Sequence, residues 1–107
     1  MMRWTPSLSK YRTLRVSDSA KADLKQIGNY TRRKWGAAQT RKYLGGLRDK
    51  FKALTNSPGL GAPRDEIATN LRALPVGKHI IYYRETDDNL EILRVLHKSM
   101  DVAPLKN

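Results

Sequence analysis

The stretch LRALPVGKHIIYYRETDDNLEILRVL, residues 71–96, decides the fold of this chain. Apolar and polar side chains alternate through its short runs, and the connecting residues 75–78 and 86–89 are rich in Pro, Gly, Asp and Asn. Period-two alternation is typical of strands, and joints this short link antiparallel neighbours. The stretch therefore predicts an antiparallel meander. Its expected strands are residues 71–74, 79–85 and 90–96.

A short strand and a first helix are predicted ahead of this meander. Residues 11–16 alternate as a half-buried strand does. Ser17 or Asp18 can then cap a helix, because each carries an oxygen that accepts hydrogen bonds from first-turn amides. Gly36 is the expected C-terminal cap of this helix. The side chains predicted to form its buried stripe are Ala20, Leu24, Ile27 and Thr31.

A second helix is predicted to follow with a minimal joint, so that the two helices form an antiparallel hairpin. It begins near Ala37 and ends at a loop rich in Gly and Pro, residues 57–65. Its expected buried stripe is Thr40, Leu44, Leu47, Phe51 and Leu54. The element order is then β-α-α-β-β-β. This order predicts a two-layer α+β fold, in which the helical hairpin packs on one face of an antiparallel sheet.

Length and composition set limits on the number of domains and on location. A chain of 107 residues can close one modest core, so we expect one domain at residues 11–107 after an N-terminal arm at residues 1–10. Its apolar runs are shorter than the roughly 20 residues that span a bilayer, and no secretory signal is recognisable. A cytoplasmic protein without a membrane partner is expected. The absence of Cys excludes disulfides and thiolate chemistry.

Positive charge is the strongest feature of the composition. The chain has 21 Lys and Arg against 10 Asp and Glu, a formal charge of +11. Such a charge favours a polyanionic partner, either a nucleic acid or an acidic protein. Much of the excess lies on the predicted hairpin, where a solvated face and a binding surface are equally good interpretations. The hairpin cations are Lys21, Lys25, Arg32, Arg33, Lys34, Arg41, Lys42, Arg48, Lys50 and Lys52.

Polar residues gather where the last predicted strand ends. The segment ILRVLHKSMD, residues 92–101, passes from an apolar strand into His97 and then Asp101. Near Arg84 and Arg94, His97 could act as a general acid or base on a phosphodiester. The simpler interpretation, which the sequence alone favours, is that His97 satisfies hydrogen bonds at the strand end and that Asp101 pairs with an arginine.

Other kinds of site have little support in the sequence. His97 and Asp101 lack a third ligand, so neither a metal nor another cofactor is predicted. The segment GLGAPRD, residues 59–65, lacks the spacing and the lysine of a phosphate-binding loop. One of Tyr82 and Tyr83 must face away from the helices, where packing is favoured over base stacking. Trp35 is predicted to pack at the corner of the hairpin.

The chain resembles the ParE toxins of type II toxin–antitoxin systems, within the wider RelE/ParE superfamily. The resemblance covers nearly all of residues 11–105. Its blocks are YTRRKWG (30–36), AAQTRKYLGGL (37–47), LRALPVGKHIIYYR (71–84) and ILRVLHKSMD (92–101). It implies a bacterial growth-inhibiting toxin that a ParD-like antitoxin neutralises in a hetero-oligomeric complex. ParE members are associated with poisoning DNA gyrase, whereas RelE members with the same fold cut mRNA in the ribosome.

Gyrase inhibition is the preferred implication, because this chain lacks an obvious complete catalytic set and a poison needs only to bind. A ribosome-dependent mRNA endoribonuclease is the alternative, with His97 and Arg84 as catalytic residues. A plain nucleic-acid-binding module is the third possibility. The residues expected to bind the target are Arg84, Arg94, His97, Lys98, Met100 and Asp101. Those expected to bind the antitoxin are the apolar anchors Tyr30, Tyr43 and Leu47 and the charged rim Arg33, Arg41 and Arg48.

Overall fold

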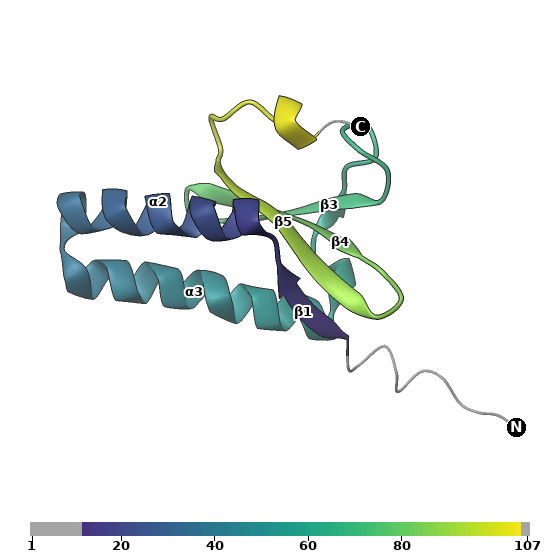
Figure 1. Ribbon diagram of the computed structural model, residues 1–107, viewed down its shortest axis with the longest axis horizontal. Coiled ribbons are helices and arrows are strands. Elements are labelled where there is room, and N and C mark those ends of the chain that lie inside the picture. The colour runs from purple at the N-terminus through teal and green to yellow at the C-terminus, as the bar shows by residue number, and fades with distance from the viewer. Residues whose placement is uncertain (1–11, 106–107) are drawn as a thin grey trace, which may run out of the picture.

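In a computed structural model that describes residues 12–105, a helical hairpin packs on one face of a five-stranded sheet (Figure 1). The predicted α+β class and element order are confirmed. The elements are β1 (Thr13–Val16), α2 (Asp18–Trp35), α3 (Ala37–Asn56), β2 (Ala62–Pro63), β3 (Leu71–Val76), β4 (His79–Glu85) and β5 (Asn89–His97), with 3-10 turns at Pro58–Leu60 and Ala103–Leu105. The expected arm at residues 1–10 lies outside the described residues.

The strand order in the sheet is β1-β5-β4-β3-β2. Strands β3, β4 and β5 form the predicted antiparallel meander, but β1 pairs with β5 in parallel, from Thr13 opposite Asn89 to Val16 opposite Ile92. The sheet is therefore mixed rather than wholly antiparallel. A tight turn would force an antiparallel arrangement, whereas β1 and β5 are separated in the chain by both helices and the other strands, so a parallel pairing is open to them.

The predicted loop at residues 57–65 is partly regular, because it contains a 3-10 turn and the short strand β2. The buried hydroxyl of Tyr83 holds this segment, since it donates to the carbonyl of Pro58 and accepts from the amide of Gly61 at 2.8 Å. A Cβ atom at position 61 would lie 2.5 Å from the Tyr83 hydroxyl. Only glycine allows this approach, so the loop is ordered by a contact that local composition does not reveal.

The two helices begin and end where their capping residues predict. The Ser17 hydroxyl accepts from the amide of Ala20 at 2.9 Å, and Gly36 ends α2 with a φ of 87°. Gly36 also precedes the first residue of α3, so the hairpin has the minimal joint that was expected. Both predicted stripes face the core. The structure adds two buried residues of α2 that the apolar pattern did not include, Gly28 and the carboxylate Asp23.

The main core lies between the hairpin and the sheet, and a smaller cluster lies on the opposite face. Tyr83 belongs to the main core and Tyr82 to the smaller cluster, and both are buried, so the packing interpretation of this pair is confirmed. The C-terminal turn Ala103–Leu105 lies on the sheet face away from the helices, where Leu105 packs on the smaller cluster (Figure 1). No helix in residues 12–105 is long and apolar enough to cross a membrane.

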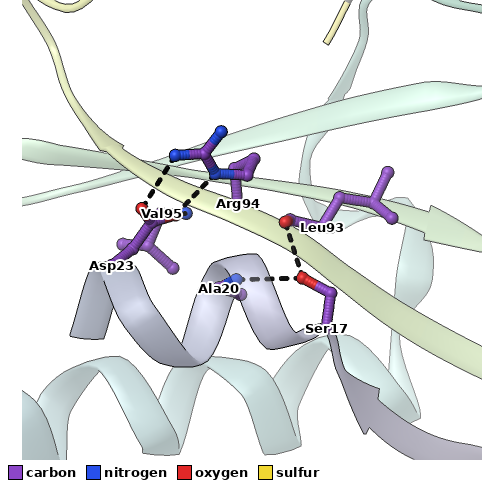
Figure 2. A network of polar contacts seen from close by, with 6 residues as sticks. All are labelled: Ser17, Ala20, Asp23, Leu93, Arg94 and Val95. Atoms are coloured by element: carbon purple, nitrogen blue, oxygen red, sulfur yellow. Dashed lines mark hydrogen bonds and ion pairs between the residues drawn. The ribbon is translucent and has the colours of Figure 1, made fainter. Parts of the chain in front are cut away.

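The N-terminal half of α2 completes the edge of β5, as Figure 2 shows. β5 runs on past the last residue of β1, and its backbone would otherwise lack partners there. The Ser17 hydroxyl donates to the carbonyl of Leu93 at 2.8 Å, and the amide of Val95 donates to Oδ2 of Asp23 at 2.9 Å. Arg94 donates to both oxygens of the same carboxylate, at 2.8 and 2.9 Å. These side chains therefore take the place of a neighbouring strand.

Replacement of Asp23 should destabilise the fold. Asp23→Ala leaves the amide of Val95 and the guanidinium of Arg94 without their acceptor, and we expect a loss of about 2–4 kcal/mol in the free energy of unfolding. Asp23→Asn keeps an acceptor oxygen and should lose less. The measurement is urea denaturation, with Asp49→Ala as the matched control, because Asp49 is an exposed aspartate on the other helix.

A double-mutant cycle separates this ion pair from the strand-edge contact. Because Asp23→Ala and Arg94→Met remove the same pair, their combined effect should be smaller than the sum of the two single effects. Strict additivity would contradict the role assigned to the pair, as would an effect of Asp23→Ala no larger than that of the control.

Candidate functional site

A groove of about 1020 Å³ opens between the hairpin and one end of the sheet. Most of its wall comes from α2, and its remaining sides come from α3, from the turn between β3 and β4, and from the end of β5. The lining residues are Asp23, Gln26, Ile27, Asn29, Tyr30, Thr31, Arg33, Lys34 and Trp35 on α2, Gln39 and Tyr43 on α3, Gly77, Lys78 and His79 before and in β4, and Val95, His97, Ser99 and Met100 at the C-terminal side.

Large apolar side chains are exposed around this groove. Tyr30 is 55% exposed, Trp35 66% and Met100 52%. Of the large hydrophobic side chains that are exposed in residues 12–105, only Leu60 lies elsewhere. An exposed apolar cluster next to a hollow marks an interaction site more often than chance exposure does. The prediction that Trp35 packs at the hairpin corner is wrong, because the helix ends beside it at Gly36 and its side chain stays exposed.

The floor of the groove holds a chain of polar rings. The Tyr43 hydroxyl lies 2.7 Å from Nδ1 of His79, and the rings of His79 and His97 meet edge to face with their centroids 5.5 Å apart. These histidines are directly opposite each other in the β4–β5 ladder. Nδ1 of His97 accepts from the amide of Ser99 at 3.1 Å. When His97 is neutral, its proton is therefore on Nε2.

The turn between β3 and β4 brings Tyr43 to this floor. Gly77 has a φ of 57°, which favours glycine, and a Cβ atom there would lie 2.8 Å from the Tyr43 hydroxyl. The same hydroxyl donates to the carbonyl of Val76 at 3.2 Å and accepts from the amide of Lys78 at 3.3 Å. A side chain at position 77 would thus strain the turn and displace the tyrosine from α3 that closes the groove.

The surroundings of His79 and Tyr43 both favour the neutral form of the side chain. Burial lowers the pKa of His79, the neighbouring His97 lowers it further, and Asp23 opposes both effects. Burial raises the pKa of the Tyr43 hydroxyl, partly offset by the hydrogen bond from Lys78. Two adjacent imidazoles can accept and donate protons, and the same polar floor can support a bound segment. Among residues 12–105, no group of His, Asp and Glu side chains is arranged to hold a metal ion.

The residues predicted to bind a target do not form one cluster. His97 and Met100 line the groove, and Lys98 and Asp101 are exposed beside it. Asp101 accepts from the amide of Ala103 at 3.0 Å, so it caps the following turn. Within the described chain it forms no ion pair with an arginine.

The two arginines of the predicted target set are placed differently. Arg94 is engaged by Asp23, a contact that also raises its pKa. Arg84 follows His79 by five residues in β4, which separates them by roughly 16 Å along the strand. Its Nε atom is buried and has no hydrogen-bond partner among the described residues. Arg84 and His97 are therefore not brought together in the way a shared catalytic site would need.

The residues predicted to bind an antitoxin fall into three groups. Tyr30, Arg33 and Tyr43 line the groove. Arg41 and Arg48 instead line a second hollow, of about 330 Å³. Leu47 has an exposed fraction of 0%, so it belongs to the core and cannot act as a surface anchor. The apolar periodicity of α3 correctly predicted Leu47 in the buried stripe. A side chain buried in the core cannot also be an antitoxin anchor, so the second prediction for Leu47 is wrong.

The groove residues that were not predicted to belong to a site include His79, Trp35 and Asp23. His79 could have been found from the predicted hairpin, because pairing residues 79–85 with 90–96 already brings it near His97. Trp35 was assigned to packing rather than to recognition, since exposure at a helix end depends on where the neighbouring elements stop. The burial of Asp23 could not be predicted from the helical pattern. It depends on the amide of Val95 in β5, which donates to the carboxylate and is distant in the sequence.

Comparisons with known proteins agree on one family. The family model described as the ParE toxin of the type II toxin–antitoxin system parDE matches residues 14–102. Toxin ParE1 of Caulobacter vibrioides is 36% identical over 87 residues, which cover 81% of this chain and 90% of that protein.

Two solved structures share the fold. The chromosomal ParDE toxin–antitoxin system from P. aeruginosa has a TM-score of 0.72 at 21% identity, over 82% of this chain and 97% of that one. The toxin–antitoxin complex RelBE2 from Mycobacterium tuberculosis has a TM-score of 0.61 at 22% identity, over 81% and 98%. At these identities the likeness concerns the fold alone.

The lowered pKa of His79 predicts a pH dependence of stability. Because the unfolded chain binds a proton at His79 more readily than the folded one, stability should fall as the pH drops through about 6.5 toward the lower folded pKa. The thermal midpoint at about pH 7, 6 and 5 should therefore fall less in His79→Gln than in the natural chain. His97→Gln, which removes only the secondary influence, should give an intermediate slope. An unchanged slope in His79→Gln would contradict this assignment.

Proposed function

This chain belongs to the family of ParE toxins of type II toxin–antitoxin systems, and on that premise we propose that it inhibits growth by binding and poisoning DNA gyrase. The observation that supports a binding mechanism is the groove with its exposed rim of Tyr30, Trp35 and Met100. Exposed aromatic and Met side chains around a hollow are typical anchors for a protein partner. A poison of this kind needs no chemistry, because it has only to bind one state of gyrase better than the others.

The second part of the proposal is that a ParD-like antitoxin neutralises the toxin as one component of a hetero-oligomeric complex. An acidic amphipathic segment would lay its apolar side chains against Tyr30 and Trp35, with Arg33 and Lys34 as the charged rim. The chain's charge of +11 would speed its capture of such a segment. Tyr43 supports this surface from the floor. Arg41 and Arg48, which lie outside the groove, would contact the antitoxin only if it extends around the hairpin.

For the target we propose a contact surface made by the segment after β5, with Lys98, Met100 and Asp101 exposed and His97 behind them. Arg94 supports this surface indirectly, since its ion pair with Asp23 holds the end of β5 against α2. Arg84 lies at the other end of β4 and would belong to a separate contact. The proposed antitoxin and target surfaces meet at His97 and Met100, which both line the groove. An antitoxin seated there would cover part of the surface that gyrase needs. Because gyrase acts on DNA in the cytoplasm, the proposal places the toxin there too.

One observation favours a second candidate, a ribosome-dependent endoribonuclease. His79 and His97 are in ring contact in the same groove, with the Tyr43 hydroxyl next to His79. Two histidines can share the roles of general acid and base in the cleavage of a phosphodiester. Under this candidate His79 replaces Arg84 as the partner of His97, since Arg84 is remote from the groove. The RelBE2 likeness does not choose between the candidates, because one fold can carry both functions.

Supercoiling of relaxed plasmid by purified gyrase tests the target. We expect the full chain to inhibit supercoiling while mRNA in a translation reaction stays intact. Lys98→Ala combined with Met100→Ala should raise the half-inhibitory concentration about tenfold or more, because exposed anchors carry most of the binding energy. The matched control is Lys50→Ala combined with Leu60→Ala, which removes a lysine and an equally exposed apolar side chain elsewhere.

The assay also has an outcome that contradicts gyrase inhibition. If gyrase is unaffected and mRNA is cut in the ribosome, the gyrase proposal is wrong and the endoribonuclease takes its place. Loss of that cleavage in both His79→Gln and His97→Gln, with folding unchanged, would then identify the histidine pair as catalytic.

Calorimetric titration with the antitoxin encoded beside this gene tests the groove. Trp35→Ala and Tyr30→Ala should each weaken the complex by about 1–3 kcal/mol, as loss of an aromatic anchor does. Leu60→Ala is the control, because Leu60 is as exposed as Tyr30 but lies outside the groove. Affinity should also fall as salt rises. Equal effects of all three substitutions would show that the antitoxin binds elsewhere.

A further inference from the structure

The hairpin carries a concentration of positive charge, of which only Arg33 and Lys34 line the groove. Between Asp18 and Asn56 there are ten Lys and Arg residues against three Asp, a net +7 out of the +11 of the whole chain. One of the three carboxylates, Asp23, is buried in its contact with Arg94. Most of the field of the molecule therefore arises from the exposed side of the two helices.

Six of these cations share one side of the hairpin, which we call the outer basic face. On α2 they are spaced by four and seven residues, and on α3 by seven and four, so each set of three forms one helical stripe. The six residues are Lys21, Lys25 and Arg32 on α2, and Arg41, Arg48 and Lys52 on α3.

The two stripes meet at the second hollow, which Arg32 from α2 and Arg41 and Arg48 from α3 line together. This hollow lies at the seam between the helices, where Leu44 contributes to its wall and also packs against Gly28. The groove uses other sides of both helices. On α3, for example, Gln39 and Tyr43 line the groove, and neither residue lines the hollow. The outer basic face can therefore be occupied while the groove is free or filled.

The cations of this face are available to a partner. All six are exposed, and none takes part in an ion pair within residues 12–105. Nearby like charges repel each other at a small cost in stability, and an anion across them removes that repulsion. The three guanidinium groups around one hollow are suited to phosphate, because each can donate two parallel hydrogen bonds to its oxygens.

The surroundings of these cations point to a duplex rather than to a protein or a single strand. Within residues 12–105, the large exposed hydrophobic side chains are Tyr30, Trp35, Leu60 and Met100, and none of these lines the hollow. A protein partner would need such anchors, and single-stranded nucleic acid would need aromatic rings on which to stack its bases. The phosphate backbone of a duplex needs only cations. The α3 stripe from Arg41 to Lys52 spans about 16 Å, long enough to face several phosphates.

We propose that the outer basic face binds the phosphate backbone of duplex DNA without sequence preference. The choice of DNA over duplex RNA rests on the proposed function, because gyrase works on duplex DNA. Binding there leaves the groove and the segment after β5 exposed to gyrase. A toxin held on the DNA that gyrase engages meets its target at a raised local concentration.

Fluorescence anisotropy with a labelled duplex of about 20 base pairs and unrelated sequence tests the proposal over a salt series. The variant Arg32→Gln/Arg41→Gln/Arg48→Gln removes the cations of the hollow and keeps good helix formers. It should weaken binding about tenfold or more, and should reduce the slope of log affinity against log salt by about 2–3, near one for each lost phosphate contact. The control Lys42→Gln/Lys50→Gln/Arg64→Gln removes the same charge elsewhere and should change the slope by less than about 1.

Each contrary outcome identifies a different error. Equal losses in the two triple variants would show that net charge alone attracts DNA, and this would overturn the proposal. Tighter binding of duplex RNA or of single strands than of duplex DNA would assign the face to another ligand and would overturn it too. Thermal unfolding of both variants shows whether either loss reflects misfolding.

The same variants in the supercoiling assay separate this inference from the proposed function. If the natural chain binds duplex DNA through the hollow but does not inhibit gyrase, the gyrase proposal is wrong and the DNA-binding proposal stands. If the variant Arg32→Gln/Arg41→Gln/Arg48→Gln binds DNA and inhibits gyrase as well as the natural chain does, the DNA-binding proposal for the outer basic face is wrong and the gyrase proposal stands.

Discussion

One buried carboxylate connects the two layers of this protein. Asp23 accepts from the backbone of β5 and from two nitrogens of the Arg94 guanidinium, and it does so from the N-terminal half of α2 (Figure 2). A strand that loses its neighbour partway along its length needs other partners for its exposed backbone groups. Here α2 supplies them. The same contact therefore determines the position of α2 over the sheet and the direction in which β5 leaves it.

The groove depends on that connection. Its wall is α2 and its far side is the end of β5, so any slip between these elements would move Tyr30 and Trp35 relative to His97 and Met100. Asp23 itself lines the groove and influences the pKa of His79. The fold and the candidate site thus share a residue, and a partner that binds the groove contacts the part of the molecule where the layers are joined.

The hairpin presents two surfaces of different chemistry. The groove side offers exposed aromatic and apolar anchors with a few cations, which suits an amphipathic protein segment. The outer basic face offers cations without anchors, which suits a phosphate backbone. A helix can carry both because side chains a few residues apart point in different directions, so Tyr43 and Arg41 lie near each other in the chain but line different hollows.

The sequence by itself determined the class of the fold, because the period of two in residues 71–96 and the period of 3.6 before it are local properties. It also determined the caps at Ser17 and Gly36, the buried stripes of both helices and the family of the chain. The loop at residues 57–65 was predicted, but its 3-10 turn and short strand were not, since the hydroxyl of Tyr83 in another strand orders them.

Only the tertiary structure decided the parallel pairing of β1 with β5, the burial of Asp23 and the exposure of Trp35. It also separated the predicted site residues, placing Leu47 in the core, Arg94 in an ion pair and Arg84 at the far end of β4. The physical reason is the same in each case. Periodicity and capping depend on neighbours along the chain, whereas the availability of a charged or aromatic side chain depends on which distant backbone or charge lies against it.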